Sequence, residues 1–231
     1  MIADKGGNFL KLILVRHGET YWNKERRVQG SGSDTELSEA GLKQANKLAS
    51  WLKDKNIDAI ISSSLKRAVS TAEAIASQHQ LPVEIDAGLK GISFGELEGL
   101  SVSSLSTTFS QFLMRWWQGG GSERLPGGES LVELQERSWA SIERLLAEHK
   151  DGMVVAVSHY FVILAIIFKA LDLPLDYLAK FKVDLGGVSI LEFEDYGPRL
   201  VAFNDTSYQG VIARVSRSPE QSEGEATKQS L

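Results

Sequence analysis

A short apolar run, Leu12–Val15, stops abruptly at Arg16, His17 and Gly18. A run this short, closed by a glycine, predicts a buried strand that delivers its last side chains to the edge of a sheet. Ligands of open α/β sheets bind at the carboxyl ends of the strands. A cation and an imidazole there, beside a glycine that lets the backbone approach a ligand closely, indicate a phosphate or oxyanion site. The tripeptide alone favours a surface Arg-His pair at a strand end, and the rest of the chain changes that interpretation.

The rest of the chain alternates strand and helix patterns, which predicts an α/β fold. We expect a three-layer sandwich, with a mostly parallel central sheet and helices on both faces. A closing antiparallel hairpin is expected around Glu194–Pro198. The further strands are expected at 57–62, 81–85 and 153–158, and the helices at about 38–55, 65–79, 129–149 and 161–171. The buried face of the first of these helices is predicted to hold Leu42, Ala45, Leu48, Ala49 and Leu52.

The length of 231 residues suits one sizeable core. We expect a single domain over residues 1–215 with a small cap insertion at about 101–128, which ends in a glycine-rich stretch. Residues 216–231 are rich in Ser, Glu and Gln, have little to bury, and are predicted to form a disordered tail.

Composition narrows the function. The net charge is −5 and no basic stripe stands out, so we expect neither a nucleic-acid nor a membrane-surface partner. Cysteine is absent, which excludes disulfides and a thiol nucleophile. No signal peptide or membrane span is recognisable, and a cytoplasmic location is expected. The oligomeric state stays open, with a homodimer as one option.

Three predicted strands end in comparable groups: Arg16-His17, Ser62 with Arg67 shortly after, and Ser158-His159. In a parallel sheet these ends share one edge, so two arginines and two histidines can converge there. Two guanidiniums suit phosphate oxygens, one neutral imidazole can attack phosphorus, and the other can stabilise charge on the oxygens. A metal site is not expected, because no third ligand has suitable spacing and the arginines disfavour a cation.

These residues lie within motifs by which the chain resembles the histidine phosphatase superfamily, the superfamily that contains phosphoglycerate mutase. The phosphatase branch is the more similar one. In this order and spacing the matches are highly specific and extend over most of residues 10–205. They are L-I-L-V-R-H-G-E-T-Y-W-N (12–23), V-Q-G (28–30), L-S-E-A-G-L-K-Q-A (37–45), S-S-S-L-K-R-A-V-S-T-A-E (62–73), F-G-E-L-E-G (94–99), P-G-G-E-S (126–130) and V-V-A-V-S-H (154–159).

The resemblance implies a phosphomonoesterase that acts on a small phosphorylated metabolite, without metal or cofactor, through a phosphohistidine. By resemblance, His17 is the nucleophile through Nε2, and Arg16, Arg67 and His159 hold the phosphoryl oxygens. The same resemblance implies that substrate is bound by Gly18, Thr20, Asn23, Gln29 and Gly30.

One departure from the family pattern concerns the general acid. The family carries a glutamate in L-x-E before F-G-x-x-E-G, whereas this chain has Gly91 at that position. A missing general acid costs roughly 10²–10⁴-fold. Of the nearby carboxylates, Glu98 is interpreted as structural, Glu129 opens a later helix, and Glu96 is the leading substitute, with a solvated loop carboxylate as the alternative.

A second departure follows the last motif, where Tyr160 and Phe161 replace the glycines common in relatives. Helix packing is the favoured interpretation of the pair, and a narrowed pocket is the other. Two further functions stay open beside the phosphatase. One is a phosphoglycerate mutase-type phosphotransferase, and the other is a phosphate-ligand binding protein whose catalysis weakened when the acid was lost.

Overall fold

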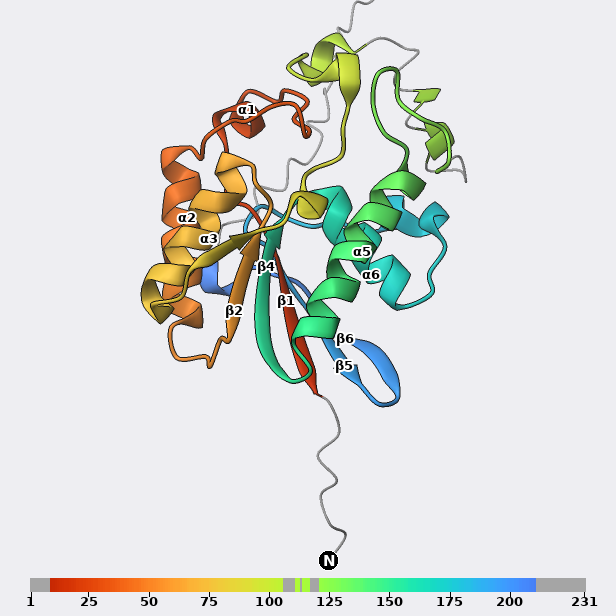
Figure 1. Cartoon of the computed structure of the whole chain (residues 1–231). Helices are drawn as coiled ribbons and strands as arrows, with labels where there is room; N and C mark the ends of the chain where they lie inside the picture. Colours follow the sequence, from red (N-terminus) through yellow and green to blue (C-terminus); the bar gives the residue numbers. More distant parts are fainter. Residues whose placement is uncertain (1–8, 106–110, 113, 117–120, 211–231) are drawn as a thin grey trace, which may run out of the picture.

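The computed structural model describes residues 9–105, 111, 112, 114–116 and 121–210. Within them a central sheet of six strands has the order β3-β2-β4-β1-β5-β6. The first four of these strands are parallel to one another, β5 runs antiparallel to β1, and β6 runs antiparallel to β5 (Figure 1). The strands are β1 (Leu10–Arg16), β2 (Ala59–Ser62), β3 (Val83–Ile85), β4 (Gly152–Ser158), β5 (Val188–Glu194) and β6 (Gly197–Asp205).

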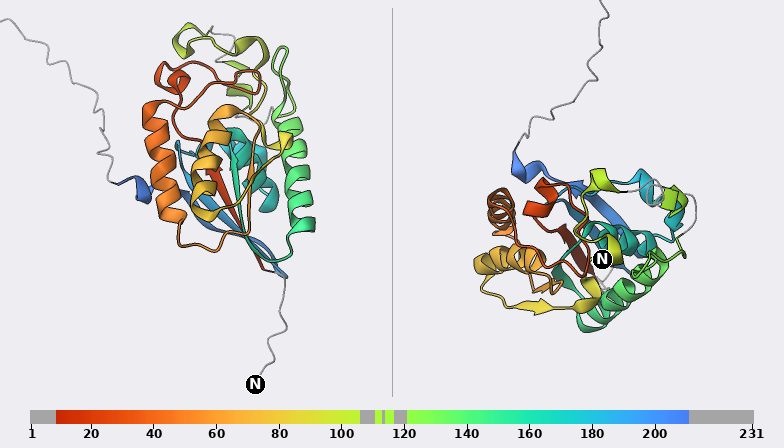
Figure 2. Two further views of the ribbon diagram at one scale, coloured as in Figure 1. Left: turned by 60° about the vertical axis from the view of Figure 1, so that its left-hand side comes forward. Right: turned by 90° about the horizontal axis from the view of Figure 1, so that it is seen from above.

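Helices cover both faces of this sheet, as Figure 1 and the turned views in Figure 2 show. One face is covered by α2 (Glu39–Leu52) and α3 (Lys66–His79), the other by α5 (Leu131–Glu148) and α6 (Tyr160–Ala170). The predicted three-layer α/β architecture is therefore confirmed. The shorter elements are α1 (Tyr21–Lys24) and the 3₁₀ turns Ala87–Leu89, Gly95–Leu97, Val102–Ser104, Leu175–Lys180 and Ser207–Gln209.

The central strand β1 shows why its sequence is an uninterrupted apolar run. Leu12 and Leu14 pack into the core under α5 and α6, whereas Ile13 and Val15 pack into the core under α2 and α3. Successive side chains of a strand point to opposite faces, so a strand buried on both faces needs an apolar residue at every position.

The sequence also sets where the helices begin. Ser38 caps α2, and Ser130 forms a capping box with Glu133 at the start of α5. The predicted face of α2 was wrong at Leu42, which is exposed. Gly41 lies against the backbone of Glu19, where a Cβ would overlap the carbonyl, and this close contact turns the next residue outward.

The 101–128 insertion is only partly described. Phe112 and Trp116 are buried in the core on the α5 and α6 side. The tail predicted at 216–231 lies outside the described residues, as do 106–110, 113 and 117–120. Among the residues that are described, no helix combines the length and the apolar character needed to cross a membrane.

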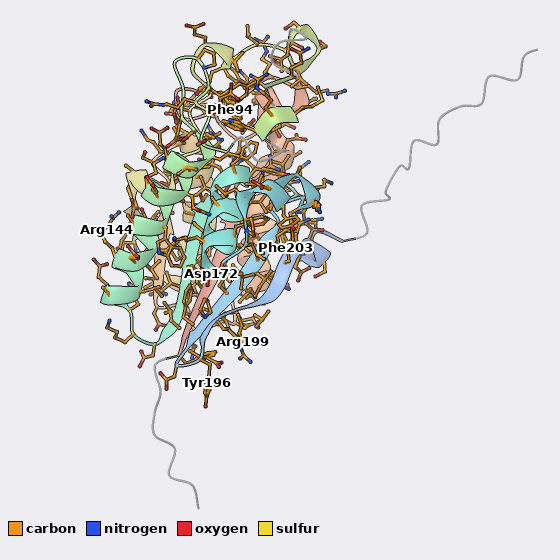
Figure 3. The ribbon with its side chains drawn as sticks, turned by 90° about the vertical axis from the view of Figure 1, so that its right-hand side faces the viewer. Phe94, Arg144, Asp172, Tyr196, Arg199 and Phe203 are labelled. Atoms are coloured by element: carbon orange, nitrogen blue, oxygen red, sulfur yellow. The ribbon has the colours of Figure 1, made fainter. Side chains whose placement is uncertain are left out.

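Loops gather at the end of the molecule toward which the parallel strands run. Figure 3 shows Phe94 at this end and Tyr196, on the turn between β5 and β6, at the opposite end. Because β1, β2 and β4 finish beneath these loops, their carboxyl ends are the place to look for a site.

Candidate active site

The carboxyl ends of two neighbouring strands, β1 and β4, bring the predicted histidines together. Arg16 of β1 is in register with Ser158 of β4, and the next residue, His17, donates its backbone N–H to the Ser158 carbonyl at 3.1 Å. His159 follows directly, and the two imidazole ring centroids lie 5.1 Å apart. The convergence expected from the sequence is present in the structure.

His17 is held as one tautomer. Its Nδ1 lies 2.8 Å from the carbonyl oxygen of Gly18, which can only accept, so Nδ1 carries the proton. Burial lowers the pKa of His17 well below its usual value, and the positive charges of Arg67 and Arg16 lower it further. The ring is therefore neutral at pH 7, and the lone pair lies on Nε2, as a nucleophile requires.

His159 is oriented by Ser63, whose Oγ lies 2.8 Å from Nε2. The other ring nitrogen, Nδ1, is buried and has no hydrogen-bond partner among the described residues. Burial and the nearby charge of Arg67 lower the pKa of this histidine well below its usual value as well. If Ser63 donates to Nε2, the neutral ring carries its proton on Nδ1 and presents a donor that a ligand oxygen can accept.

Arg16 and Arg67 are each anchored by hydrogen bonds to backbone carbonyls. Arg16 donates from Nη1 to Val183, and Arg67 donates from Nη1 and Nη2 to Ser33 and Gly30, at 2.6–2.9 Å. The buried Nε of each guanidinium has no partner within the described structure. Burial lowers the pKa of both arginines to about 10, so both remain cations at neutral pH.

These four groups form one end of a cavity of about 300 Å³. Its remaining walls are mostly apolar. Besides the two histidines and two arginines, the lining residues are Asn23, Arg27, Val28, Gln29, Gly91, Ile92, Phe94, Val102, Leu105, Tyr160 and Phe161.

Of the five residues implied to bind substrate, Asn23 and Gln29 line the cavity. Thr20, Gly18 and Gly30 do not line the cavity, but they form hydrogen bonds near its lining residues. The hydroxyl of Thr20 donates to Gln29 Oε1 at 2.9 Å, and the backbone N–H of Gly18 donates to the hydroxyl of Thr71. Gly30 supplies a carbonyl to Arg67, and any Cβ on it would overlap Glu98.

Gly91 faces His159 and Arg67. A Cβ built on it would lie 3.4 Å from His159 Cγ and 3.5 Å from Arg67 Nη2, which is ordinary contact. Its φ lies outside the left-handed region, so its backbone does not require glycine. A longer side chain at this position would extend into the cavity, where the family pattern places its glutamate.

None of the three nearby carboxylates lines the cavity. Glu96 is exposed on the turn after Phe94, so the structure does not support it as the substitute acid. Glu98 accepts from the backbone N–H groups of Gly32 and Phe94, which fits a structural role. Glu129 forms an ion pair with Arg137 at 2.6 Å.

Sequence reasoning missed the role of Ser63, although the Ser-Ser-Ser run after β2 was a signal that hydroxyls gather at the strand end. It also undervalued Tyr160 and Phe161, which pack in their helix and line the cavity as well. The Arg16 guanidinium lies 5.3 Å from the Tyr160 ring centroid, a cation–π contact.

The fold and this geometry together define a class: an α/β protein whose strand ends hold a neutral imidazole and cationic donors around a space for a tetrahedral oxyanion such as a phosphoryl group. Over the described part of the chain, no three His, Asp or Glu side chains gather closely enough to hold a metal ion.

The chain belongs to the histidine phosphatase superfamily (branch 1), whose family model matches residues 12–206. It is 37% identical over 165 residues to the probable phosphoglycerate mutase GpmB of Proteus mirabilis, covering 71% of this chain and 76% of that protein.

Solved structures give a similar result. A phosphoserine phosphatase mutant of Entamoeba histolytica, in complex with phosphoserine, superposes with a TM-score of 0.76 at 31% identity, covering 86% of this chain and 98% of that one. YhfR of Bacillus stearothermophilus superposes at 0.80 with 29% identity, covering 86% and 98%. A mycobacterial glucosyl-3-phosphoglycerate phosphatase superposes at 0.78 with 28% identity, covering 86% and 100%.

Proposed function

We propose that the protein is a phosphomonoesterase that works through a phosphohistidine on His17, without a metal ion, on small phosphorylated molecules. The observation that carries this proposal is the fixed tautomer of His17: Nδ1 is bound to Gly18, so the Nε2 lone pair is available beside two arginines. The solved phosphatases of the family, one of them holding phosphoserine, support the same class of substrate.

In the proposed reaction, the phosphoryl oxygens lie among Arg16 Nε, Arg67 Nε and His159 Nδ1, three buried nitrogen atoms of the cavity residues that lack partners in the described structure. Nε2 of His17 attacks phosphorus in line with the leaving oxygen, and water then attacks the phosphohistidine. The two guanidiniums offset charge on the equatorial oxygens in both steps.

The direct test is to trap the intermediate. We expect intact-protein mass spectrometry, after a rapid alkaline quench with phenyl phosphate, to show one added phosphoryl group that is lost in acid. His17→Ala should abolish the adduct, whereas His149→Ala, at the far end of α5, should leave it unchanged. The adduct and turnover should both persist in EDTA. Phosphate binding without any adduct would contradict the proposal and favour a binding protein.

A phosphoglycerate mutase is the second candidate, because the Proteus mirabilis relative carries that name. A mutase must be primed by a bisphosphate and returns phosphoglycerate isomers instead of inorganic phosphate. Isomer formation from 3-phosphoglycerate that depends on 2,3-bisphosphoglycerate would therefore identify it. We expect release of inorganic phosphate from monoesters and no such dependence.

A further inference from the structure

The part of the cavity that receives the leaving group contains no acid. No carboxylic acid is present among its lining residues, and Glu96, Glu98 and Glu129 lie elsewhere. The internal residues that the structure does not describe, 106–110, 113 and 117–120, include neither Asp nor Glu. Tyr160 does line the cavity, but its hydroxyl donates to the carbonyl of Phe181 at 2.8 Å.

We infer that the substrates of this site are aryl phosphates, monophosphate esters of phenols, and not esters of aliphatic alcohols. This inference rests on the proposed phosphatase function and adds the chemical class of the leaving group. It comes from the combination of an empty acid position at Gly91 and apolar walls around it.

The chemistry of the first step explains the restriction. The His17 Nε2–P bond forms while the P–O bond to the leaving group breaks, and the leaving oxygen keeps the electron pair. Because the transition state is loose, most of that charge is already on the leaving oxygen. An alkoxide therefore needs a proton from a general acid. A phenolate spreads the charge into its ring and departs without one.

The second step depends less on an acid. The water oxygen bonds to phosphorus and the P–N bond breaks. The departing group is then the neutral imidazole of His17, which needs no proton donor, and the proton of the water passes to solvent. The missing acid at position 91 therefore slows mainly the first step, in which the alcohol leaves. An aryl ester does not need a proton donor in that step.

The walls of the leaving-group space fit an aromatic ring. Phe94 and Phe161 meet edge to face with ring centroids 5.9 Å apart, and Ile92 and Val102 extend the apolar surface. Figure 3 shows Phe94 at this end of the molecule. Of the polar lining groups, Gln29 Oε1 accepts from two threonines and Arg27 Nε is paired with Glu25. Around Phe94, Phe161, Ile92 and Val102 the hydroxyls of a sugar would lose water against apolar side chains.

Phenyl phosphate and benzyl phosphate separate leaving-group acidity from ring fit, because both carry one aromatic ring and only the first releases a phenol. For the unmodified protein we expect kcat/KM to be about 10²-fold or more higher on phenyl phosphate. We expect benzyl phosphate to inhibit phenyl phosphate hydrolysis competitively, and more tightly than glycerol 2-phosphate does.

Gly91→Glu supplies the missing acid, and Gly91→Gln is its matched control with the same shape and no acidic proton. We expect Gly91→Glu to raise kcat/KM on benzyl phosphate by about 10²-fold, with less than about tenfold change on phenyl phosphate. Gly91→Gln should raise neither. This outcome would show that the unmodified site lacks only the proton donor.

Comparable rates on the two esters in the unmodified protein would overturn the aryl specificity while leaving the phosphatase intact, since a donor would then be present. Tighter binding of glycerol 2-phosphate than of benzyl phosphate would overturn the apolar fit. Failure of the proposed function itself would look different: no phosphohistidine would form with either ester.

Discussion

The two imidazoles of the site differ because each has one nitrogen committed to a different partner. A backbone carbonyl holds the Nδ1 proton of His17, whereas a hydroxyl holds Nε2 of His159. The first arrangement leaves a lone pair for attack, and the second can leave a proton for a phosphoryl oxygen. Two identical side chains, 5.1 Å apart, are thereby given opposite roles.

Ser63→Ala removes the hydroxyl that orients His159. We expect inorganic phosphate, assayed as a competitive inhibitor, to bind roughly 5–15-fold more weakly, because a net hydrogen bond contributes about 1–1.5 kcal/mol. The matched control is Ser64→Ala, one residue along, where no hydrogen bond to His159 exists. Equal weakening in both variants would show that Ser63 only supports the local fold.

At the scale of elements, Arg137 ties helix α5 to the segment that carries Gly91. Its guanidinium donates to the carbonyls of Gly88 and Gly91 at 2.7 and 3.0 Å and pairs with Glu129. Glu129 in turn accepts from the backbone N–H of Ser93. The Glu129–Arg137 ion pair therefore holds the segment that places Gly91 beside His159.

Arg137→Met should lower the free energy of unfolding by about 2 kcal/mol, since it leaves a mostly buried carboxylate and two carbonyls without their donor. Arg144→Met is the comparison on the same helix. Its guanidinium pairs with Asp86 but is 58% exposed, so we expect a loss under about 1 kcal/mol. Urea denaturation measures both, and losses of equal size would contradict the assigned role of Arg137.

The sequence predicted those elements that are marked by a local residue pattern, and it did not predict contacts between distant segments. The strand ends at Arg16 and Ser158 could be predicted, because apolar runs mark buried strands and parallel strands share an edge. The Glu129–Arg137–Gly91 arrangement could not be predicted, because no local sequence pattern shows which distant turn a helix contacts. The error at Leu42 has the same origin, since the contact that orients α2 is between Gly41 and Glu19.

The candidate site shows the same division. Motif and spacing predicted that both histidines and both arginines would converge, and all four line one cavity, whereas Glu96, the predicted substitute acid, does not line it. Glu96 was chosen for its closeness in sequence to Gly91, but the turn Gly95–Leu97 directs it to solvent. Which way a loop side chain points depends on packing that a sequence pattern does not contain.

For the whole molecule, burying two neutral histidines couples folding to pH. The pKa of both is lowered in the folded protein, by burial first and by Arg67 next, whereas unfolded histidines titrate near 6.5. Below that pH the unfolded chain binds more protons, so stability falls as pH falls. The contribution of these two histidines to stability is fully present above pH 6.5.

We therefore expect the free energy of unfolding to decline between pH 6.5 and 5.5 with a slope of up to about 1.4 kcal/mol per pH unit for each histidine. Urea denaturation at several pH values measures the slope. The double variant His17→Gln, His159→Gln should flatten it in this window, and His149→Gln should not. Parallel curves for the unmodified and double-variant proteins would show that these two histidines do not carry the coupling.

The ordinary backbone conformation of Gly91 has an evolutionary consequence. Glycine is not needed there for the backbone, and an added Cβ would make only ordinary contacts with His159 and Arg67. A glycine codon that ends in a purine differs from a glutamate codon by one base. Specificity for aryl esters alone and activity on both aryl and alkyl esters are then separated by one base change. A lineage can change from one to the other by a single mutation in the same fold.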